Sequence, residues 1–158
     1  MFRELRKKER KLSKEITEEI LKKCTSGVLA LAGDDGYPYG VPISYAYSEG
    51  KIFFHCAKEG YKVDAIKRNP KVCFTVIAQD DVIPEAYGND FASVIVFGKA
   101  SFIEDPEEML KSHIHIIEKY SSEYYDGGIE YFNKAKNAMR MVKIDIENIT
   151  GKGKGVRI

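Results

Sequence analysis

The chain has 158 residues and a nearly balanced charge, with 25 basic and 24 acidic side chains. This length fits a single domain over residues 1–158 with a substantial core. The balanced charge argues against nucleic acid as a partner, and the absence of a run of 18 apolar residues excludes a membrane-spanning helix.

The N-terminal residues 1–13 form a charged arm without the apolar stretch of a signal peptide. Two interpretations are open for this arm. It is either a solvated helical turn, or a segment that packs on a partner subunit or covers a ligand. Ser13 is a typical N-cap residue, and the apolar stripe after it predicts a helix to about Lys23.

The three cysteines are odd in number and form no CxxC pair. This pattern indicates free thiols in a reducing compartment, so we expect a cytoplasmic protein.

Short apolar segments joined by glycine-containing turns follow the first helix. They predict an antiparallel meander with strands over residues 28–32, 39–47 and 51–57. Pro42 lies within the second of these strands and cannot donate to a ladder. We therefore expect an edge strand, a bulge, or a position that faces a ligand.

Residues 52–70 predict a strand, a tight turn and a helix that ends before Pro70. The start of such a helix has free N–H groups and the positive end of the helix dipole, and both favour an anion such as phosphate. Lys62 falls in the first turn, where the dipole opposes a cation unless an anion binds. The alternative is that Lys62 points into solvent and Glu59 offsets its charge.

The second half of the chain alternates strands with helices. The pattern predicts a break at Gly127-Gly128 and a bulge or bend at Gly98. The predicted segments are a strand over 71–79, a polar loop over 80–89, a long strand over 91–103, a helix that starts at the Asp105 N-cap, a loop with one short helix over 120–137, a strand over 139–149, and a flexible basic tail over 151–158.

These elements predict a mainly β fold (β+α). About six strands joined by tight turns are too many for a doubly wound sheet. A six-stranded antiparallel barrel with peripheral helices fits best.

The three histidines predict no metal site. His113 and His115 are two positions apart on a helix, so they face different directions, and His113 fits the buried stripe. His55 has two interpretations. It is either a histidine at the edge of the core, or a polar group beside a ligand that donates a hydrogen bond or a proton.

An ordered set of sequence blocks resembles the flavoproteins related to pyridoxamine-phosphate oxidase, which have an FMN-binding split β-barrel. Within them the chain is most similar to the nitroimidazole-resistance (Nim) branch. The blocks are GVLA at 27–30, PYGVPISY at 38–45, IFFHCAKEGYK at 52–62, NPKVCF at 69–74, SVIVFGKA at 93–100 and IDIENITGK at 144–152.

The resemblance implies a split β-barrel homodimer that binds FMN between its subunits. It places the flavin ring along residues 41–45 and beside His55, and the phosphate at residues 60–62. The implied cofactor-binding residues are Val41, Pro42, Ile43, Ser44, Tyr45, His55, Cys56, Ala57, Gly60, Tyr61, Lys62 and Ser93, with Ser93 a candidate contact from the partner subunit. His55 is the implied catalytic residue.

The activity implied by the resemblance is an FMN-dependent oxidoreductase that transfers electrons from a reduced nicotinamide to a small molecule. For the Nim branch this means reduction of a nitro group toward an amine. A flavin- or haem-binding sensor or storage protein without turnover is the alternative, and some relatives use a deazaflavin. A dimerisation or nucleic-acid-binding module that uses the basic arm is a third possibility, which the balanced charge disfavours.

Overall fold

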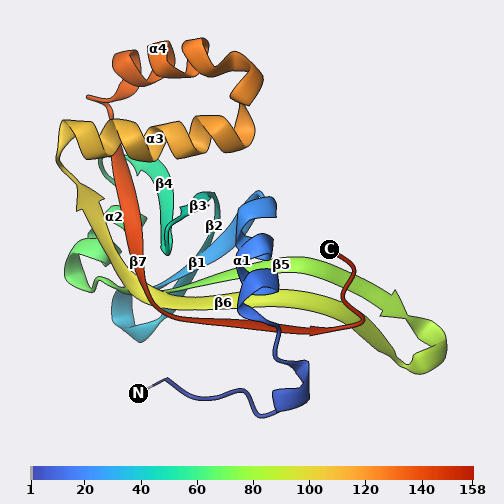
Figure 1. Cartoon of the computed structure of the whole chain (residues 1–158). Coiled ribbons are helices and arrows are strands. Elements are labelled where there is room, and N and C mark those ends of the chain that lie inside the picture. Colours follow the sequence, from blue (N-terminus) through green and yellow to red (C-terminus); the bar gives the residue numbers. More distant parts are fainter. Residues whose placement is uncertain (1) are drawn as a thin grey trace.

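The computed structural model describes residues 2–158, which form one antiparallel sheet of seven strands with four α-helices (Figure 1). The strands are β1 (Ser26–Ala32), β2 (Pro38–Ser44), β3 (Ala46–Ser48), β4 (Lys51–Ala57), β5 (Lys71–Ile83), β6 (Gly88–Ile103) and β7 (Met139–Lys154). The helices are α1 (Lys14–Lys23), α2 (Tyr61–Arg68), α3 (Pro106–Tyr120) and α4 (Tyr125–Ala135), with short 3-10 turns η1 (Lys8–Arg10), η2 (Asp34–Gly36), η3 (Pro84–Ala86) and η4 (Ser122–Tyr124). No helix in the described part of the chain is long and apolar enough to cross a membrane.

The sheet curves so that its two edge strands meet at one residue. The strand order is β2-β1-β5-β6-β7-β4-β3, which places β2 and β3 at opposite edges. Only Tyr45 separates the end of β2 from the start of β3, so the two edges come together there. Away from Tyr45, β2 has no pairing with β4, and the result is a barrel that is split between these two strands.

The mainly β class is confirmed, whereas the predicted number of six strands is wrong. The sequence pattern predicts one strand over residues 39–47, but the chain bends at Tyr45 and forms two. Tyr45 is completely buried, and its hydroxyl donates to the Leu21 carbonyl at 2.8 Å. Its N–H donates to the Tyr120 hydroxyl at 3.0 Å. Because these contacts engage the Tyr45 backbone, strand pairing is interrupted at this position.

The barrel is filled by apolar side chains, and α1 packs against β3, β5, β6 and β7. The Ser13 side chain accepts a hydrogen bond from the Ile16 N–H at 3.3 Å, so the predicted N-cap is confirmed. The largest fully buried side chains include Tyr45, Phe54, Phe74, Ile20, Leu21 and Leu29.

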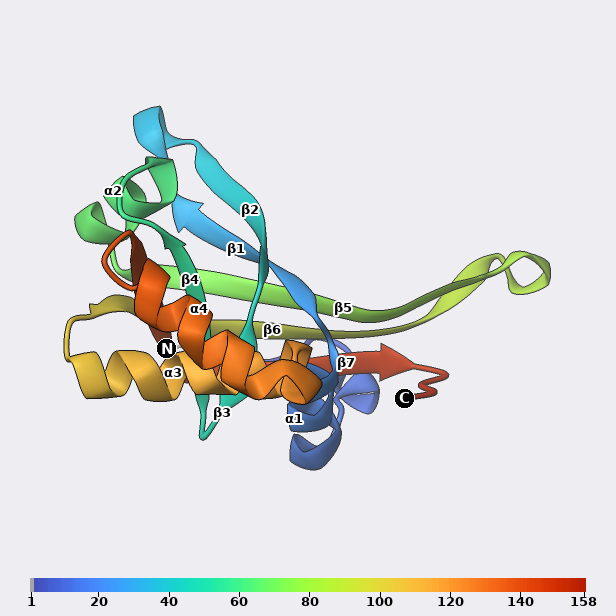
Figure 2. The ribbon, with the colours of Figure 1, turned by 90° about the horizontal axis from the view of Figure 1, so that it is seen from above.

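A long hairpin of β5 and β6 projects from the rest of the molecule (Figures 1 and 2). The predicted polar loop over residues 80–89 is mostly strand, because both strands continue to the turn η3. The C-terminal segment stabilises this hairpin. The Arg157 guanidinium contacts the Asp81 carboxylate at 2.8 Å and the Asp90 carboxylate at 3.0 Å.

The last strand is longer than the sequence pattern predicts. β7 continues to Lys154, so the first four residues of the predicted tail belong to the sheet. The predicted bulge at Gly98 is confirmed by a register shift between Phe97 and Gly98. A Cβ on Gly98 would collide with the Asp145 carbonyl of β7, so only glycine allows this close approach.

Helix α3 lies between α4 and the sheet (Figure 1). Its predicted start is confirmed, since the Asp105 carboxylate accepts a hydrogen bond from the Glu108 N–H at 2.8 Å. The predicted break at Gly127-Gly128 is wrong, because both glycines lie inside α4. A Cβ on Gly128 would lie 2.8 Å from the Ile117 side chain. Glycine therefore lets α4 approach α3, and this packing outweighs its low helix propensity.

Candidate functional site at the barrel split

The split between β2 and β4 leaves two strand edges without ladder partners in the described chain. β2 pairs with β1 alone. β4 pairs with β7 along its whole length, whereas its other edge pairs with β3 only over residues 51–53. Residues 54–57 therefore have a free edge toward the split. Because a free strand edge exposes backbone donors and acceptors, this opening can hold a ligand by main-chain hydrogen bonds.

β2 offers mainly its backbone to the split. The Val41 and Ile43 side chains pack against the core, whereas Pro42 and Ser44 are exposed on the other face. Pro38 and Pro42 are four positions apart on β2, so their backbone nitrogens point toward the same edge of the strand. Neither nitrogen carries a hydrogen. Two missing donors fit the unpaired edge, where they remove no ladder hydrogen bond. The predicted edge position of Pro42 is confirmed.

Tyr45 marks the point at which the split begins. Its carbonyl accepts a hydrogen bond from the Tyr120 hydroxyl at 2.8 Å, in addition to the partners of its N–H and its own hydroxyl. This predicted cofactor residue therefore has its polar groups engaged within the chain. Its role in the structure is to fix where β2 and β3 separate.

The start of α2 lies directly after β4 and has the features of an anion site. Gly60 is the N-cap, with a φ of 132° that favours glycine, and no side chain caps the helix. The first helical hydrogen bond runs from the Asp64 N–H to the Gly60 carbonyl at 3.1 Å, which leaves the N–H groups of residues 61–63 without helical partners. A Cβ on Gly60 would have no described atom within 4 Å. An anion would therefore find open space, free donors and the positive end of the dipole.

Tyr61 ties this helix start to the connection between β1 and β2. Its hydroxyl accepts a hydrogen bond from the Asp34 N–H at 2.7 Å, and its ring packs edge-on against Tyr39 with centroids 4.3 Å apart. Arg68 at the other end of α2 forms an ion pair with Asp34 at 2.8 Å. The Tyr61 side chain thus anchors the helix across the mouth of the split, and its backbone N–H is the group that is free for a ligand.

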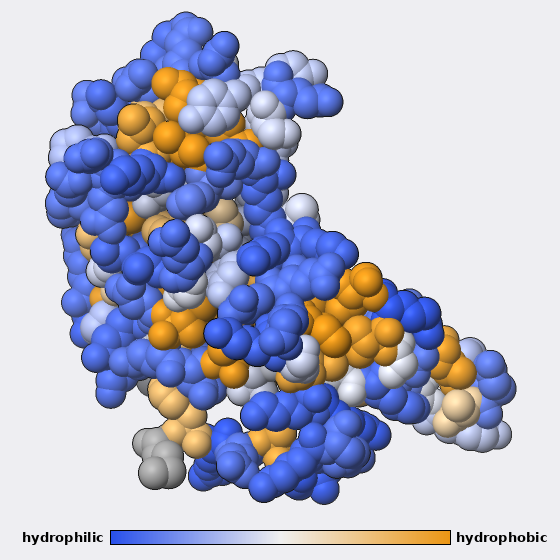
Figure 3. Space-filling view, viewed as in Figure 1, coloured by the Kyte–Doolittle hydropathy of each residue, from blue (hydrophilic) through white to orange (hydrophobic). Residues whose placement is uncertain are grey.

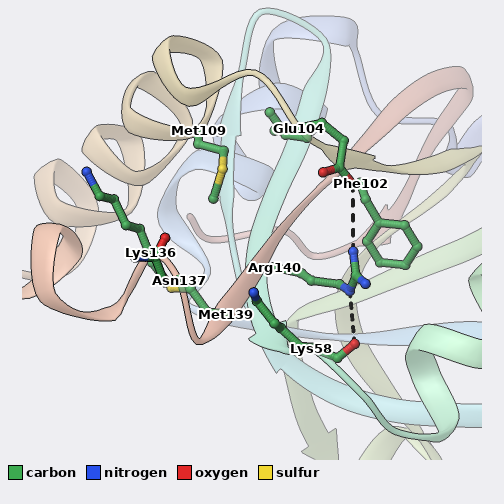
Figure 4. A pocket seen from close by; sticks show the side chains of 9 residues that line it. Lys58, Phe102, Glu104, Met109, Lys136, Asn137, Met139 and Arg140 are labelled. Carbon is green, nitrogen blue, oxygen red and sulfur yellow. Dashed lines mark hydrogen bonds and ion pairs between the residues drawn. The ribbon is translucent and has the colours of Figure 1, made fainter.

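Arg140 holds the turn that precedes α2, and sequence reasoning missed this residue. Its Nε donates to the Lys58 carbonyl at 2.9 Å, and its guanidinium lies 4.9 Å from the Phe102 ring centroid and 3.7 Å from the Glu104 carboxylate (Figure 4). These residues line a hollow of about 300 Å³ beside the turn. Arg140 and Lys58 are 82 positions apart in the sequence, so no local pattern links them.

The electrostatic environment keeps both His55 and Cys56 uncharged near pH 7. Partial burial, and then the nearby Lys62 ammonium, lower the pKa of His55 below its usual value. Burial raises the pKa of the Cys56 thiol, and Lys62 and Arg140 oppose this shift only in part. A neutral imidazole can donate one hydrogen bond and accept another, whereas a protonated thiol is a poor nucleophile. His55 is therefore the better candidate for a chemical role.

Ser93 is the predicted site residue that one chain does not bring to the split. It lies on β6 opposite Ile77 and Lys152, with β5 and β1 between it and β2. The other predicted residues lie on β2, on β4, at Tyr45 or at the start of α2.

The remaining histidines do not form a metal site in the described part of the chain, where no group of three or more potential ligands is found. His113 is buried with 3% exposure, so its predicted place in the core is confirmed. His115 stacks on Phe53 with ring centroids 5.5 Å apart.

A sequence model of the pyridoxamine 5'-phosphate oxidase family matches residues 13–153. The chain belongs to this family. The match includes every residue of the predicted site, and the family prediction made from the ordered sequence blocks is confirmed. A search of curated proteins finds no match to the chain.

Several solved structures share the fold of this chain at low sequence identity. A conserved hypothetical protein from Mycobacterium tuberculosis aligns with a TM-score of 0.82 at 19% identity, over 98% of this chain and 97% of the other. A candidate 5-nitroimidazole antibiotic resistance protein from Bacteroides thetaiotaomicron VPI-5482 aligns with a TM-score of 0.75 at 23% identity, over 90% and 86%. An FAD-binding protein from Mycobacterium smegmatis aligns with a TM-score of 0.67 at 20% identity, over 90% and 96%.

Proposed function

We propose that this chain binds FMN in the split between β2 and β4 and acts as a flavin-dependent oxidoreductase. The observation that carries the proposal is the juxtaposition of two free strand edges with the uncapped start of α2. A flat ring with polar atoms along its rim fits between strand edges, and a phosphate fits the helix start. The FAD-binding protein from Mycobacterium smegmatis supports a flavin, and the uncapped start of α2 suits the single phosphate of FMN.

Each predicted residue has a distinct part in this proposal. The backbone of residues 41–44 would contact the rim of the ring, and His55, Cys56 and Ala57 would flank it from β4. The N–H groups of Tyr61 and Lys62 would bind the phosphate, together with the Lys62 ammonium. The open space over Gly60 is consistent with an anion close to the backbone. The bound flavin would supply electron transfer from a reduced nicotinamide to an acceptor.

His55 is the candidate for the proton-handling group. Its neutral ring can hold a hydrogen bond to the cofactor or to the acceptor without placing a positive charge there. Relatives include the candidate nitroimidazole resistance protein, so we include nitroaromatic compounds among the acceptors to be tested.

The complete site is proposed to need a homodimer. Exposed apolar side chains lie together on the outer face of β1, β5 and β6. Val28 on β1 and Ile95 on β6 both lie opposite Thr75 on β5, so their side chains share one face of the sheet. Ile77 and Phe97 are each two positions further along their strands and therefore lie on the same face. Apolar surface also follows the projecting hairpin (Figure 3). Burying such a surface is a driving force for association. Ser93 borders this face, from which it would reach the site of the partner subunit.

An absorption spectrum of the protein as purified tests the cofactor. Flavin bands, followed by release of FMN on denaturation, are the expected result, and mass spectrometry of the released compound separates FMN from FAD. A sharp Soret band would indicate haem instead. A colourless protein that fails to bind added FMN would overturn the proposal. Oxidation of NADH or NADPH with nitroaromatic or quinone acceptors then distinguishes an enzyme from a protein that binds flavin without turnover.

A further inference from the structure

The hollow of about 300 Å³ beside the turn before α2 has an apolar floor and a charged rim (Figure 4). Ile103 and Met139 in the floor are 4% and 8% exposed, and Met109 is partly buried. The charged side chains come from the turn after β4, from the ends of β6 and α4, and from the start of β7. A few polar groups around an apolar floor are typical of a ligand site.

The rim carries more positive than negative charge. Lys58, Lys136 and Arg140 are cationic, and Glu104 is the single acidic residue of the lining. In the described part of the chain, the contact of Arg140 with Glu104 at 3.7 Å is the one ion pair among these four side chains. Three cations against one carboxylate leave an excess of two positive charges around the hollow. Like charges repel at this range, so an anion between them would be stabilising.

Arg140 is held in a fixed orientation at this rim. Its Nε donates to the Lys58 carbonyl, its guanidinium lies over the Phe102 ring, and its side chain is 26% exposed. Figure 4 shows Arg140 and Lys58 next to each other at one side of the hollow, with Lys136 and Asn137 at the other. A guanidinium that is already oriented loses little freedom when it binds a phosphate. Arg140 is therefore more than a mobile surface charge.

The charge excess matches a phosphate monoester. Such a group carries a charge of about −1.5 to −2 near pH 7, whereas a carboxylate or a phosphate diester carries only one negative charge. The hollow is small for a ligand pocket, since these pockets range from about 300 to 1,000 Å³. It can therefore hold the phosphate-bearing end of a larger molecule.

The position of the hollow suits the remote end of an electron donor. Lys58 lies two residues before Gly60, the N-cap of α2, so the hollow lies beside the mouth of the proposed flavin site. A reduced nicotinamide dinucleotide has its reacting ring at one end and an adenosine ribose at the other. In NADPH this ribose carries a 2'-phosphate monoester, for which arginine is the usual partner in proteins, whereas NADH has a hydroxyl there.

We propose that this hollow binds the 2'-phosphate of NADPH between Arg140 and Lys58, and that the chain thereby selects NADPH over NADH as its electron donor. The assignment as donor rests on the proposed flavin function. Binding of the 2'-phosphate itself does not depend on flavin.

Methyl NMR of the methionines in the full-length protein as purified tests this proposal. Met109 and Met139 line the hollow, whereas Met141 is fully buried and does not. The probes are adenosine 2',5'-bisphosphate, which has the 2'-phosphate of NADPH, and 5'-AMP, which lacks it. We expect saturable shifts of the Met109 and Met139 signals with the bisphosphate, larger than any shift of Met141. Both 5'-AMP and inorganic phosphate should bind at least about tenfold more weakly.

Three variants extend the test. Lys58→Gln removes the ammonium but keeps the backbone carbonyl that orients Arg140, and should weaken binding of the bisphosphate by about fivefold or more. Glu104→Gln removes the opposing carboxylate and should strengthen binding by about twofold or more. Lys134→Gln is the matched control, because Lys134 lies on α4 outside the hollow and pairs with Glu130 at 2.6 Å.

Kinetics then test the selection of the donor. We expect kcat/KM to be at least about tenfold higher with NADPH than with NADH, and Lys58→Gln to lower this ratio by about the factor by which it weakens the bisphosphate. A general loss of structure would reduce both values and leave their ratio unchanged.

Stationary Met109 and Met139 signals, equal affinity for the bisphosphate and either of the two weaker probes, or unchanged binding by Lys58→Gln would each overturn the proposal. A yellow protein that uses NADH and NADPH equally well would retain the flavin function and reject the selection of NADPH. A colourless protein that binds the bisphosphate at Met139 would overturn the flavin function and the donor role, but would retain the hollow as a phosphate site.

Discussion

The Tyr120 hydroxyl accepts a hydrogen bond from the Tyr45 N–H at 3.0 Å and donates to the Tyr45 carbonyl at 2.8 Å or to the Thr25 carbonyl. One side chain at the end of α3 thereby holds the residue at which β2 and β3 separate. The helix layer and the split are consequently coupled, since a movement of α3 would change the geometry of the barrel opening.

Tyr120→Phe should weaken this junction. The substitution keeps the ring and removes the group that satisfies the Tyr45 backbone, so we expect a loss of about 1–2 kcal/mol in the free energy of unfolding. Urea titration measures it. Tyr124→Phe is the matched control, because the Tyr124 side chain is 73% exposed and its hydroxyl has no hydrogen bond within the described chain. Equal effects of the two substitutions would show that the Tyr120 hydroxyl does not stabilise the junction.

The anion site at the start of α2 predicts a specific effect of Lys62→Glu. The new carboxylate would repel the FMN phosphate at close range, so we expect binding of added FMN to weaken by at least about a hundredfold, or roughly 3 kcal/mol. Isothermal titration with the FMN-free protein measures this change. Lys67→Glu places the same charge change at the far end of the same helix and should alter the affinity much less. Similar losses in the two variants would indicate a general charge effect and contradict a phosphate seat at Lys62.

Lys119 gives a prediction about the pH dependence of stability. Burial lowers its pKa to about 8, although its ammonium donates to the Cys24 carbonyl at 2.5 Å. Between about pH 8 and the usual lysine value of 10.5, the unfolded chain binds more protons at this residue than the folded chain. The contribution of Lys119 to stability therefore rises with pH across this window.

The measurement is the free energy of unfolding from urea titrations at several pH values, compared with Lys119→Met. The difference between the two proteins should shift in favour of the wild type as the pH rises from 8 to 10. The comparison is needed because burial raises the pKa of Cys24 and of Tyr45, and both shifts lower stability at high pH. A difference that stays constant with pH would contradict the lowered pKa of Lys119.

Local signals in the sequence predicted much of the fold. The caps at Ser13 and Asp105 and the bulge at Gly98 are confirmed, because each depends on residues close in the chain or on a backbone constraint of glycine. The residues of β4 and α2 themselves also predict the strand, the turn and the helix with its uncapped start. The ordered sequence blocks led to the correct family.

The errors occur where distant contacts decide the structure. The bend at Tyr45 depends on Leu21 and Tyr120, and the position of the turn before α2 depends on Arg140. The two strands of the extended hairpin are held by ion pairs from Arg157 to Asp81 and Asp90, which lie far from Arg157 in the sequence. No pattern within one segment contains this information.

The two adjacent glycines of α4 should respond to alanine with opposite signs. A methyl group on Gly128 would lie 2.8 Å from Ile117 and push α4 away from α3, so we expect Gly128→Ala to cost about 1–3 kcal/mol of stability. Gly127→Ala meets no described atom and should add up to about 1 kcal/mol through helix propensity. Thermal unfolding of the two variants measures both effects. A stabilised Gly128→Ala protein would show that the close contact between the two helices is not needed.

The exposed apolar face predicts the effect of a charge on the oligomeric state. Ile77 is 69% exposed in the single chain, so Ile77→Asp should leave the fold of the subunit intact. In the proposed homodimer this side chain is buried against the partner subunit, and an aspartate there would be desolvated without a counter-charge. We therefore expect a dimer for the wild type and a monomer for the variant in sedimentation-velocity experiments. Val82 on the projecting part of the β5–β6 hairpin is also largely exposed. Val82→Asp therefore tests whether this hairpin takes part in the same contact between subunits. A wild-type monomer that binds FMN fully would contradict a site shared between subunits, and so would an Ile77→Asp dimer of unchanged stability.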